Sequence, residues 1–230
     1  MDTHFAVIWE SVADAVPNHP AIIQGDRKVS WRDYERRAAL LAQGFLNAGL
    51  GPNSKVAIYL HNAPEYCETN FAAMKIRGIP INVNYRYLDN ELHYLLENAD
   101  AEALVFHSSL SDRVSRVHSR LPKLRALVEV NDGPAQDGSK SYKAADNYEE
   151  FLASTSPATR TEPVGDETYM FYTGGTTGMP KGVIYPMCDF TAFFMRGFPP
   201  MVGLDPFEKP SQFAPMAKQM VESGSAIVAM

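Results

Sequence analysis

The sequence is organised around the string Thr173-Gly174-Gly175-Thr176-Thr177-Gly178-Met179-Pro180-Lys181-Gly182. An apolar run rich in β-forming residues, 168–172, precedes the string, and a second, 183–185, follows it. Pro180 biases the residue before it toward an extended backbone, which disfavours a helix at this point. The string therefore predicts a polar loop that joins two strands.

The residue types of this loop suit a phosphate group. Its glycines can take φ > 0 without steric cost, so their backbone N–H groups can turn together toward an anion. Its threonines add hydroxyl donors that can also reach a phosphate-bound metal ion, and its lysine adds a full charge. A lysine about 4 Å from a phosphate charge gains roughly 4 kcal/mol at an effective dielectric constant of about 20. The candidate phosphate contacts are Thr173, Gly174, Gly175, Thr176, Thr177, Gly178 and Lys181.

Two other interpretations of the loop are weaker. A Walker A loop needs glycine before its lysine, serine or threonine after it, and a helix beyond. Here Pro180 precedes Lys181 and Gly182 follows it. A plain hairpin turn can also be rich in glycine and threonine, but the length of the string and its lysine favour a phosphate site.

The string from Tyr172 to Val183 resembles the phosphate loop of the adenylate-forming, AMP-binding superfamily. Acyl-CoA synthetases, luciferases and peptide-synthetase adenylation domains belong to this superfamily. A second string, Gly78-Ile79-Pro80-Ile81-Asn82-Val83-Asn84-Tyr85-Arg86-Tyr87, is most similar to bacterial fatty acyl-CoA synthetases. The resemblance covers nearly the whole chain.

The resemblance implies an ATP-dependent acid–thiol ligase for a fatty or other lipid-like acid. Such an enzyme uses ATP and Mg²⁺ to form an acyl-adenylate, and it then transfers the acyl group to coenzyme A. It also implies that Lys181 is catalytic and that the loop binds the phosphates, whereas Arg86 is given no catalytic role. Three alternatives stay open: an aryl-CoA ligase, a peptide-synthetase adenylation domain, and a non-catalytic phosphate-binding module.

Composition narrows the class of protein. The chain has 230 residues, 45% hydrophobic and 21% charged, which is typical of globular proteins. A net charge of −6 without a long basic run argues against general nucleic-acid binding. No apolar run approaches the length of a membrane span. The expected partners are therefore small-molecule substrates, and the oligomeric state stays open, a homodimer being one alternative.

The cysteines and histidines form no metal-binding pattern. Cys67 and Cys188 lack the spacing of metal ligands or of a redox pair, so we expect no disulfide and a reducing, cytoplasmic location. The six histidines also lack metal-ligand spacing, and we expect no bound metal at any of them.

Apolar strands alternate with helices through the middle of the chain, which predicts an α/β fold, layered αβα, with a mostly parallel sheet. Strands are expected at 56–60, 79–83, 103–106 and 126–130, and helices at 4–16, 64–77, 89–96 and 111–121. A hairpin is expected around Gly25, and Ser30 is expected to cap a helix whose arginines, Arg32, Arg36 and Arg37, face solvent.

Beyond the phosphate loop the expectations are fewer. A helix at 187–196 should bury Phe190, Phe193 and Phe194 in the core, residues 197–210 should form a loop, and 226–230 a strand. The family's later motifs are missing, so the resemblance implies an N-terminal portion that is inactive alone. The expected units are residues 1–49 in a second, incomplete sheet, 50–198 as an α/β subdomain, and 199–230 as the start of a second subdomain.

Overall fold

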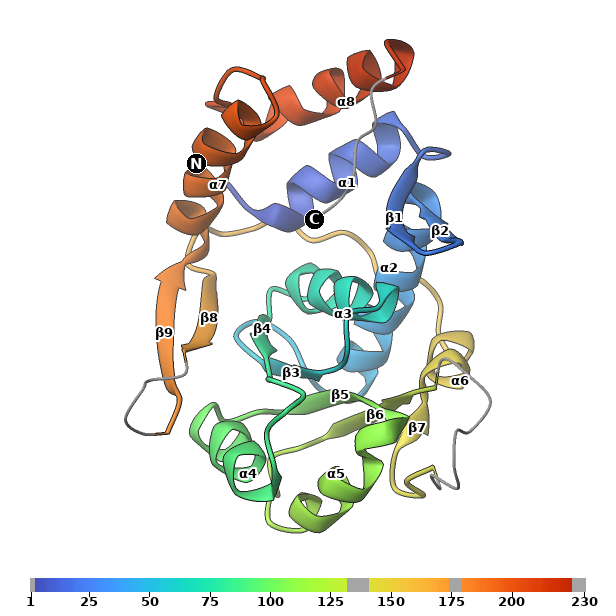
Figure 1. Ribbon diagram of the computed structural model, residues 1–230, viewed down its shortest axis with the longest axis vertical. Helices are drawn as coiled ribbons and strands as arrows, with labels where there is room; N and C mark the ends of the chain where they lie inside the picture. Colours follow the sequence, from blue (N-terminus) through green and yellow to red (C-terminus); the bar gives the residue numbers. More distant parts are fainter. Residues whose placement is uncertain (1–2, 132–140, 174–178, 225–230) are drawn as a thin grey trace.

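The structure, a computed structural model, describes residues 3–131, 141–173 and 179–224. Its main sheet has seven strands in the order β7-β6-β5-β3-β4-β8-β9, and β1 and β2 form a separate two-stranded sheet. Neighbouring strands from β7 to β8 are parallel, and β8 and β9 are antiparallel. The predicted α/β fold with a mostly parallel sheet is confirmed (Figure 1).

Most elements lie where the sequence predicted them. The strands are β1 (Pro20–Gln24), β2 (Arg27–Ser30), β3 (Lys55–Tyr59), β4 (Ile79–Asn82), β5 (Ala103–His107), β6 (Ala126–Val130), β7 (Asp146–Asn147), β8 (Thr168–Thr173) and β9 (Lys181–Pro186). The helices are α1 (Phe5–Ala15), α2 (Trp31–Asn47), α3 (Pro64–Lys75), α4 (Asp89–Asn98), α5 (Ser111–His118), α6 (Tyr148–Ala153), α7 (Met187–Met201) and α8 (Phe213–Glu222), with short 3₁₀ turns η1 (Ser108–Leu110) and η3 (Pro210–Gln212).

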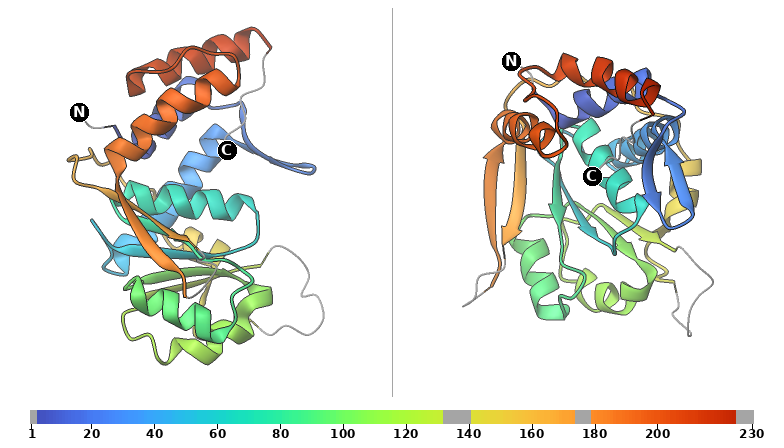
Figure 2. Two further views of the ribbon diagram at one scale, coloured as in Figure 1. Left: turned by 60° about the vertical axis from the view of Figure 1, so that its left-hand side comes forward. Right: turned by 45° about the horizontal axis from the view of Figure 1, so that its top comes forward.

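Helices cover both faces of the sheet, which explains why its central strands are apolar throughout. On β3, Val56 and Ile58 face the core under α2 and α3, whereas Ala57 and Tyr59 face the core under α4 and α5. All four residues are fully buried. Figures 1 and 2 show these helix layers on opposite sides of the strands.

The face of α2 that was predicted to be solvated is partly buried. Arg37 bonds to the fully buried Glu68 at 2.8 Å and makes two bonds to Glu149. Tyr148 donates a further hydrogen bond to Glu68. The solvated-face prediction is wrong for Arg37, because a buried carboxylate on α3 requires a cation and polar partners around it.

Helix α7 is longer than predicted. It runs through Pro199 and Pro200 to Met201, whereas the sequence predicted a loop from residue 197. A proline in the last turn of a helix lacks a backbone N–H donor, but its carbonyl can still accept a hydrogen bond. The Pro199 carbonyl accepts from the N–H groups of Val202 and Leu204. Helix α8 was not predicted, and the predicted strand at 226–230 lies outside the described residues.

The proposed division into units stays a prediction. The hairpin β1–β2 does form a sheet of its own. Helix α2 nevertheless shares one core with α3 and with the main sheet. The first 49 residues therefore contribute to the same core as the segment that follows them.

Candidate functional site

The hairpin β8–β9 carries the predicted phosphate loop. Thr173 ends β8 and Lys181 begins β9, and the two residues are paired across the hairpin. Both are exposed, and Lys181 has no salt bridge within the described residues. The predicted strands on either side of the loop are confirmed, and the structure brings the two ends of the loop together. Gly174, Gly175, Thr176, Thr177 and Gly178 lie outside the described residues.

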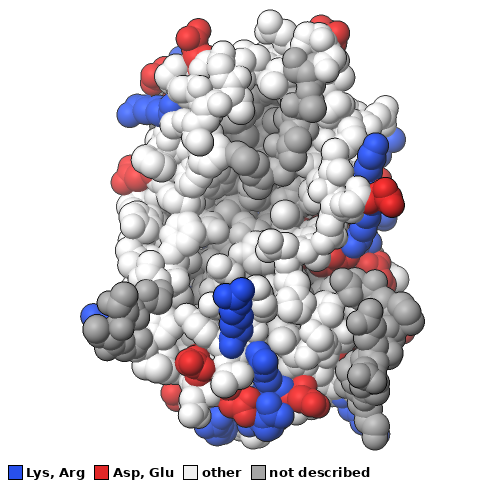
Figure 3. Space-filling model, viewed as in Figure 1, with Lys and Arg blue, Asp and Glu red and all other residues white. Residues whose placement is uncertain are grey.

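The second feature is an apolar cavity of about 530 Å³ between the helices above the sheet. Figure 3 shows the hollow on this face, with charged side chains away from it. It is lined from α1, α2, α3, β8, α7, α8 and the segment between α7 and α8. The lining residues are Phe5, Ile8, Trp9, Val12, Trp31, Tyr34, Tyr66, Cys67, Asn70, Met74, Tyr169, Phe171, Phe190, Phe194, Met195, Phe198, Pro199, Val202, Leu204, Phe207, Phe213, Met216, Ala217 and Met220.

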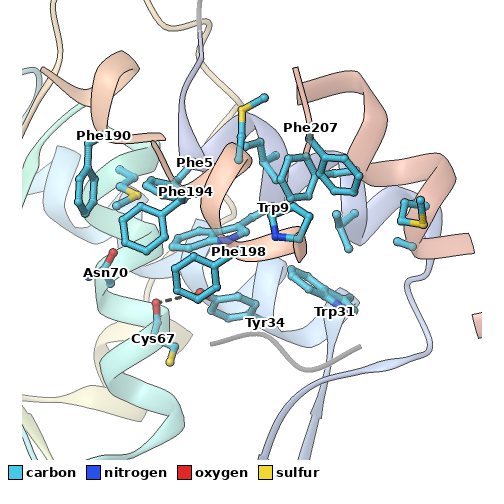
Figure 4. Close-up of a pocket in the computed structure, with 18 of the residues that line it drawn as sticks. Phe5, Trp9, Trp31, Tyr34, Cys67, Asn70, Phe190, Phe194, Phe198 and Phe207 are labelled. Atoms are coloured by element: carbon cyan, nitrogen blue, oxygen red, sulfur yellow. Dashed lines mark hydrogen bonds between the residues drawn. The ribbon is translucent and has the colours of Figure 1, made fainter. Parts of the chain in front are cut away.

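Packed aromatic rings form one side of the cavity. The lining rings of Trp9 and Tyr34 each pack against the fully buried ring of Phe71, with centroids 5.1 Å apart. The Tyr34 hydroxyl, the one polar atom of its side chain, donates to the backbone carbonyl of Cys67 at 3.2 Å (Figure 4). Because this bond satisfies the hydroxyl, the surface offered to a ligand there is apolar.

Helix α7 supplies a row of phenylalanines to the cavity (Figure 4). Phe190, Phe194 and Phe198 follow at intervals of four residues, which places them on one helix face. The ring of Phe194 lies 4.7 Å from that of Phe190 and 4.8 Å from that of Phe198. The sequence predicted core packing for this helix, but Phe190 and Phe194 line the cavity and Phe193 is 69% exposed.

Strand β8 connects the cavity to the phosphate loop. Because side chains alternate along a strand, Tyr169 and Phe171 face one side and Met170 and Tyr172 the other. The rings of Tyr169 and Phe171 lie 4.8 and 5.1 Å from that of Phe190, at the cavity. Met170 and Tyr172 pack with the core under α4. The cavity wall at Phe171 is thus two residues from Thr173.

The cavity has few polar groups. The Asn70 amide donates to the Tyr169 hydroxyl at 3.3 Å. Burial raises the pKa of the Tyr66 hydroxyl, and burial likewise raises the pKa of the Cys67 thiol to about 11. Since the thiolate is the reactive form, Cys67 is a packing residue rather than a nucleophile. Both cysteines are free.

A buried charge cluster fixes α1 at the cavity. The Lys75 Nζ lies 2.6 Å from a Glu10 carboxylate oxygen on α1 and 2.8 Å from one of Glu35 on α2. Arg160 extends the cluster to Glu35 and to Asp14. Because Lys75 belongs to α3, the cluster ties three of the cavity's helices together.

Within the described ranges, no group of three or more His, Cys, Asp and Glu side chains gathers as metal ligands do. No described helix has both the length and the hydropathy needed to cross a bilayer. The cavity was not predicted from the sequence. The aromatic residues of α1 and α7 recur at helical spacing, but this pattern fits a solid core as well as a cavity wall.

Comparison with known proteins agrees with the sequence resemblance. The pattern of the family described as "AMP-binding enzyme" matches residues 9–217. Medium-chain acyl-CoA ligase Mig of Mycobacterium avium is 37% identical over 207 residues, covering 83% of this chain and 36% of that protein. The 3-oxocholest-4-en-26-oate–CoA ligase of Rhodococcus rhodochrous is 40% identical over 186 residues, covering 80% and 33%. The chain thus spans about a third of the length of these relatives.

Solved structures show the same fold. A long-chain-fatty-acid-CoA ligase of Archaeoglobus fulgidus matches with a TM-score of 0.75 at 20% identity, covering 99% of this chain and 47% of that one. The anthranilate CoA ligase AuaEII matches with a TM-score of 0.72 at 22% identity, covering 83% and 36%.

Proposed function

Because the chain belongs to the AMP-binding enzyme family, we propose that it is part of an ATP-dependent ligase that joins an apolar carboxylic acid to coenzyme A. In this reaction a carboxylate oxygen bonds to the α-phosphorus of ATP, and the bond to pyrophosphate breaks. The thiol of coenzyme A then loses its proton to solvent, its sulfur bonds to the acyl carbon, and AMP leaves with the electrons of the broken C–O bond.

The phosphate loop would hold the leaving pyrophosphate. Thr173 and Lys181 are paired across the hairpin at the two ends of the loop. Residues paired in this way lie on the same face, so a hydroxyl donor and a cation lie next to each other there. The proposal adds the backbone N–H groups and hydroxyls of residues 174–178 as further donors. Donors placed before the reaction are worth about 10²–10³ in rate each. Mg²⁺, bound by the phosphates, would supply further charge neutralisation.

The apolar cavity carries the substrate assignment. Its volume of about 530 Å³ lies within the roughly 300–1,000 Å³ of typical small-ligand pockets. Its lining is aromatic and aliphatic, and it shares β8 with the phosphate loop, so an apolar tail would lie near the nucleotide. Two relatives are named as a medium-chain acyl-CoA ligase and a 3-oxocholest-4-en-26-oate–CoA ligase, and both names agree with an aliphatic acid as the substrate.

The test is ATP–pyrophosphate exchange by the full-length protein with a panel of acids: octanoate, palmitate, benzoate and phenylalanine. We expect exchange with the aliphatic acids, and we expect EDTA to abolish it. Exchange driven only by benzoate or phenylalanine would support the aryl-CoA or peptide-synthetase alternative. Absence of exchange with every acid would overturn the proposal.

The compartment and the assembly state complete the proposal. A reducing compartment such as the cytoplasm suits a chain whose two cysteines are free. Fractionation of cells would test this location, and light scattering would test the homodimer that the sequence left open.

A further inference from the structure

The phosphate hairpin is weakly attached to the sheet at its loop end. Strand β8 pairs with β4 at Met170, opposite Ile81, three residues before the strand ends. On the other side β9 is an edge strand, and all of its residues are exposed. Figure 1 shows this end of the hairpin reaching away from the strands beside it. Sheet pairing alone therefore does little to fix Thr173 and Lys181.

Tyr172, the residue before Thr173, makes a separate connection to the body of the protein. Its ring packs against the core under α4, and its hydroxyl donates to the Asn98 side-chain oxygen at 2.8 Å. Asn98 is the last residue of α4. Burial raises the pKa of the Tyr172 hydroxyl, so it keeps its proton and remains a donor at neutral pH.

Gly182 makes room for this tyrosine. It is paired with Tyr172 across the hairpin. A Cβ atom at position 182 would lie 3.1 Å from Cζ of Tyr172 and 3.3 Å from its hydroxyl oxygen. The φ angle of Gly182 is not positive, so the backbone itself does not require glycine here. Because Gly182 has no side chain, the Tyr172 ring can extend from β8 across β9.

Other hydrogen bonds attach the hairpin to the protein at positions farther from the loop. Glu167, just before β8, bonds to Arg77 at 2.6 Å, and its backbone carbonyl accepts from Met187 at the start of α7. The Tyr169 hydroxyl, which accepts from Asn70, lies three residues before Tyr172 and on the opposite face of β8. Among the described residues of β8, Tyr172 is thus the side chain that anchors the loop end.

We propose that Tyr172 is a positioning residue, which holds Thr173 and Lys181 in place for the phosphates of ATP through its bond to Asn98 and its ring over Gly182. This inference rests on the proposed ligase function. It predicts that loss of the hydroxyl weakens ATP binding, and that the binding of the acid is left unchanged.

The test compares Tyr172→Phe, Asn98→Ala and the double variant of the full-length protein in the exchange assay. One neutral hydrogen bond corresponds to a change of about threefold to tenfold, and we expect the KM for ATP to rise by that factor. The KM for the acid and the Tm should stay at the wild-type values. The double variant should be no worse than either single one, because both remove the same bond. Gly182→Ala, which displaces the ring, should raise the KM for ATP as well.

Tyr142→Phe is the matched control. It also removes a tyrosine hydroxyl bond, the one to His118 at 2.9 Å, at a site away from the hairpin. We expect its KM for ATP to equal that of the wild type. An unchanged KM for ATP in Tyr172→Phe, or an equal rise in the KM values for ATP and acid, would overturn the inference while the ligase function stands.

Calorimetric titration of the same variants with ATP and Mg²⁺ gives a readout that needs no turnover. If the wild type lacks exchange activity but binds ATP, the ligase proposal fails and the Kd values still decide the role of Tyr172. If the wild type does not bind ATP, both proposals are wrong.

Discussion

At the scale of single residues, His4 shows how one buried side chain couples folding to pH. Its Nδ1 accepts a hydrogen bond from the Ala6 N–H at 3.1 Å and so caps α1. Its Nε2 has no hydrogen-bond partner among the described residues, and the side chain is nearly fully buried. Burial is the main cause that lowers the pKa of His4 to about 4; the carboxylate of Glu167 opposes the shift and Arg77 adds to it.

This pKa predicts a loss of stability in mild acid. The unfolded chain takes up a proton at His4 near pH 6.5, whereas the folded chain resists it until about pH 4. The stabilisation is therefore complete above pH 6.5 and is lost as the pH falls toward 4, by up to about 3 kcal/mol. His4→Asn keeps a cap and does not titrate. Urea unfolding should show a shallower fall between pH 6.5 and 4 in this variant, and an equal slope would contradict the account.

At the scale of elements, α7 separates two environments on its two faces. Phe194 lines the cavity, and the neighbouring Phe193 points to solvent. The sequence placed this helix correctly at its start. It could not distinguish a cavity wall from a solid core, because both require apolar residues at the same helical spacing. It also ended the helix too early, because the four prolines and two glycines of residues 197–210 indicated a loop.

The two phenylalanines provide a matched pair of variants. Phe194→Ala enlarges the cavity, and we expect the ratio of kcat/KM for palmitate over octanoate to rise by about tenfold, within the usual range for a changed hydrophobic pocket. Phe193→Ala should leave that ratio at the wild-type value, because its side chain is outside the cavity. The assay is pyrophosphate exchange with both acids. Equal ratios in the two variants would show that the acid does not use this cavity.

At the scale of the whole molecule, features built from residues close together in sequence were predictable, and features built from residues far apart in sequence were not. The strands and the hairpin ends were predictable because each depends on residues close together, such as the loop between Thr173 and Lys181. The cavity depends on helices from both ends of the chain, α1 and α8, which lie side by side in Figures 1 and 2. No local pattern indicates that two such helices meet. The buried cluster around Lys75 was missed for the same reason, since its partners Glu10 and Glu35 are distant in sequence.

The most direct measurement is the exchange rate of Lys181→Ala in the full-length protein. The account predicts a fall of about a hundredfold or more, because a preplaced cation that stabilises the leaving pyrophosphate is lost. The Tm should stay unchanged, since Lys181 is exposed and has no salt bridge within the described residues. Lys28→Ala, which removes an exposed lysine from β2, should exchange at the wild-type rate. Wild-type exchange by Lys181→Ala would contradict the claim that this hairpin holds the phosphates of ATP.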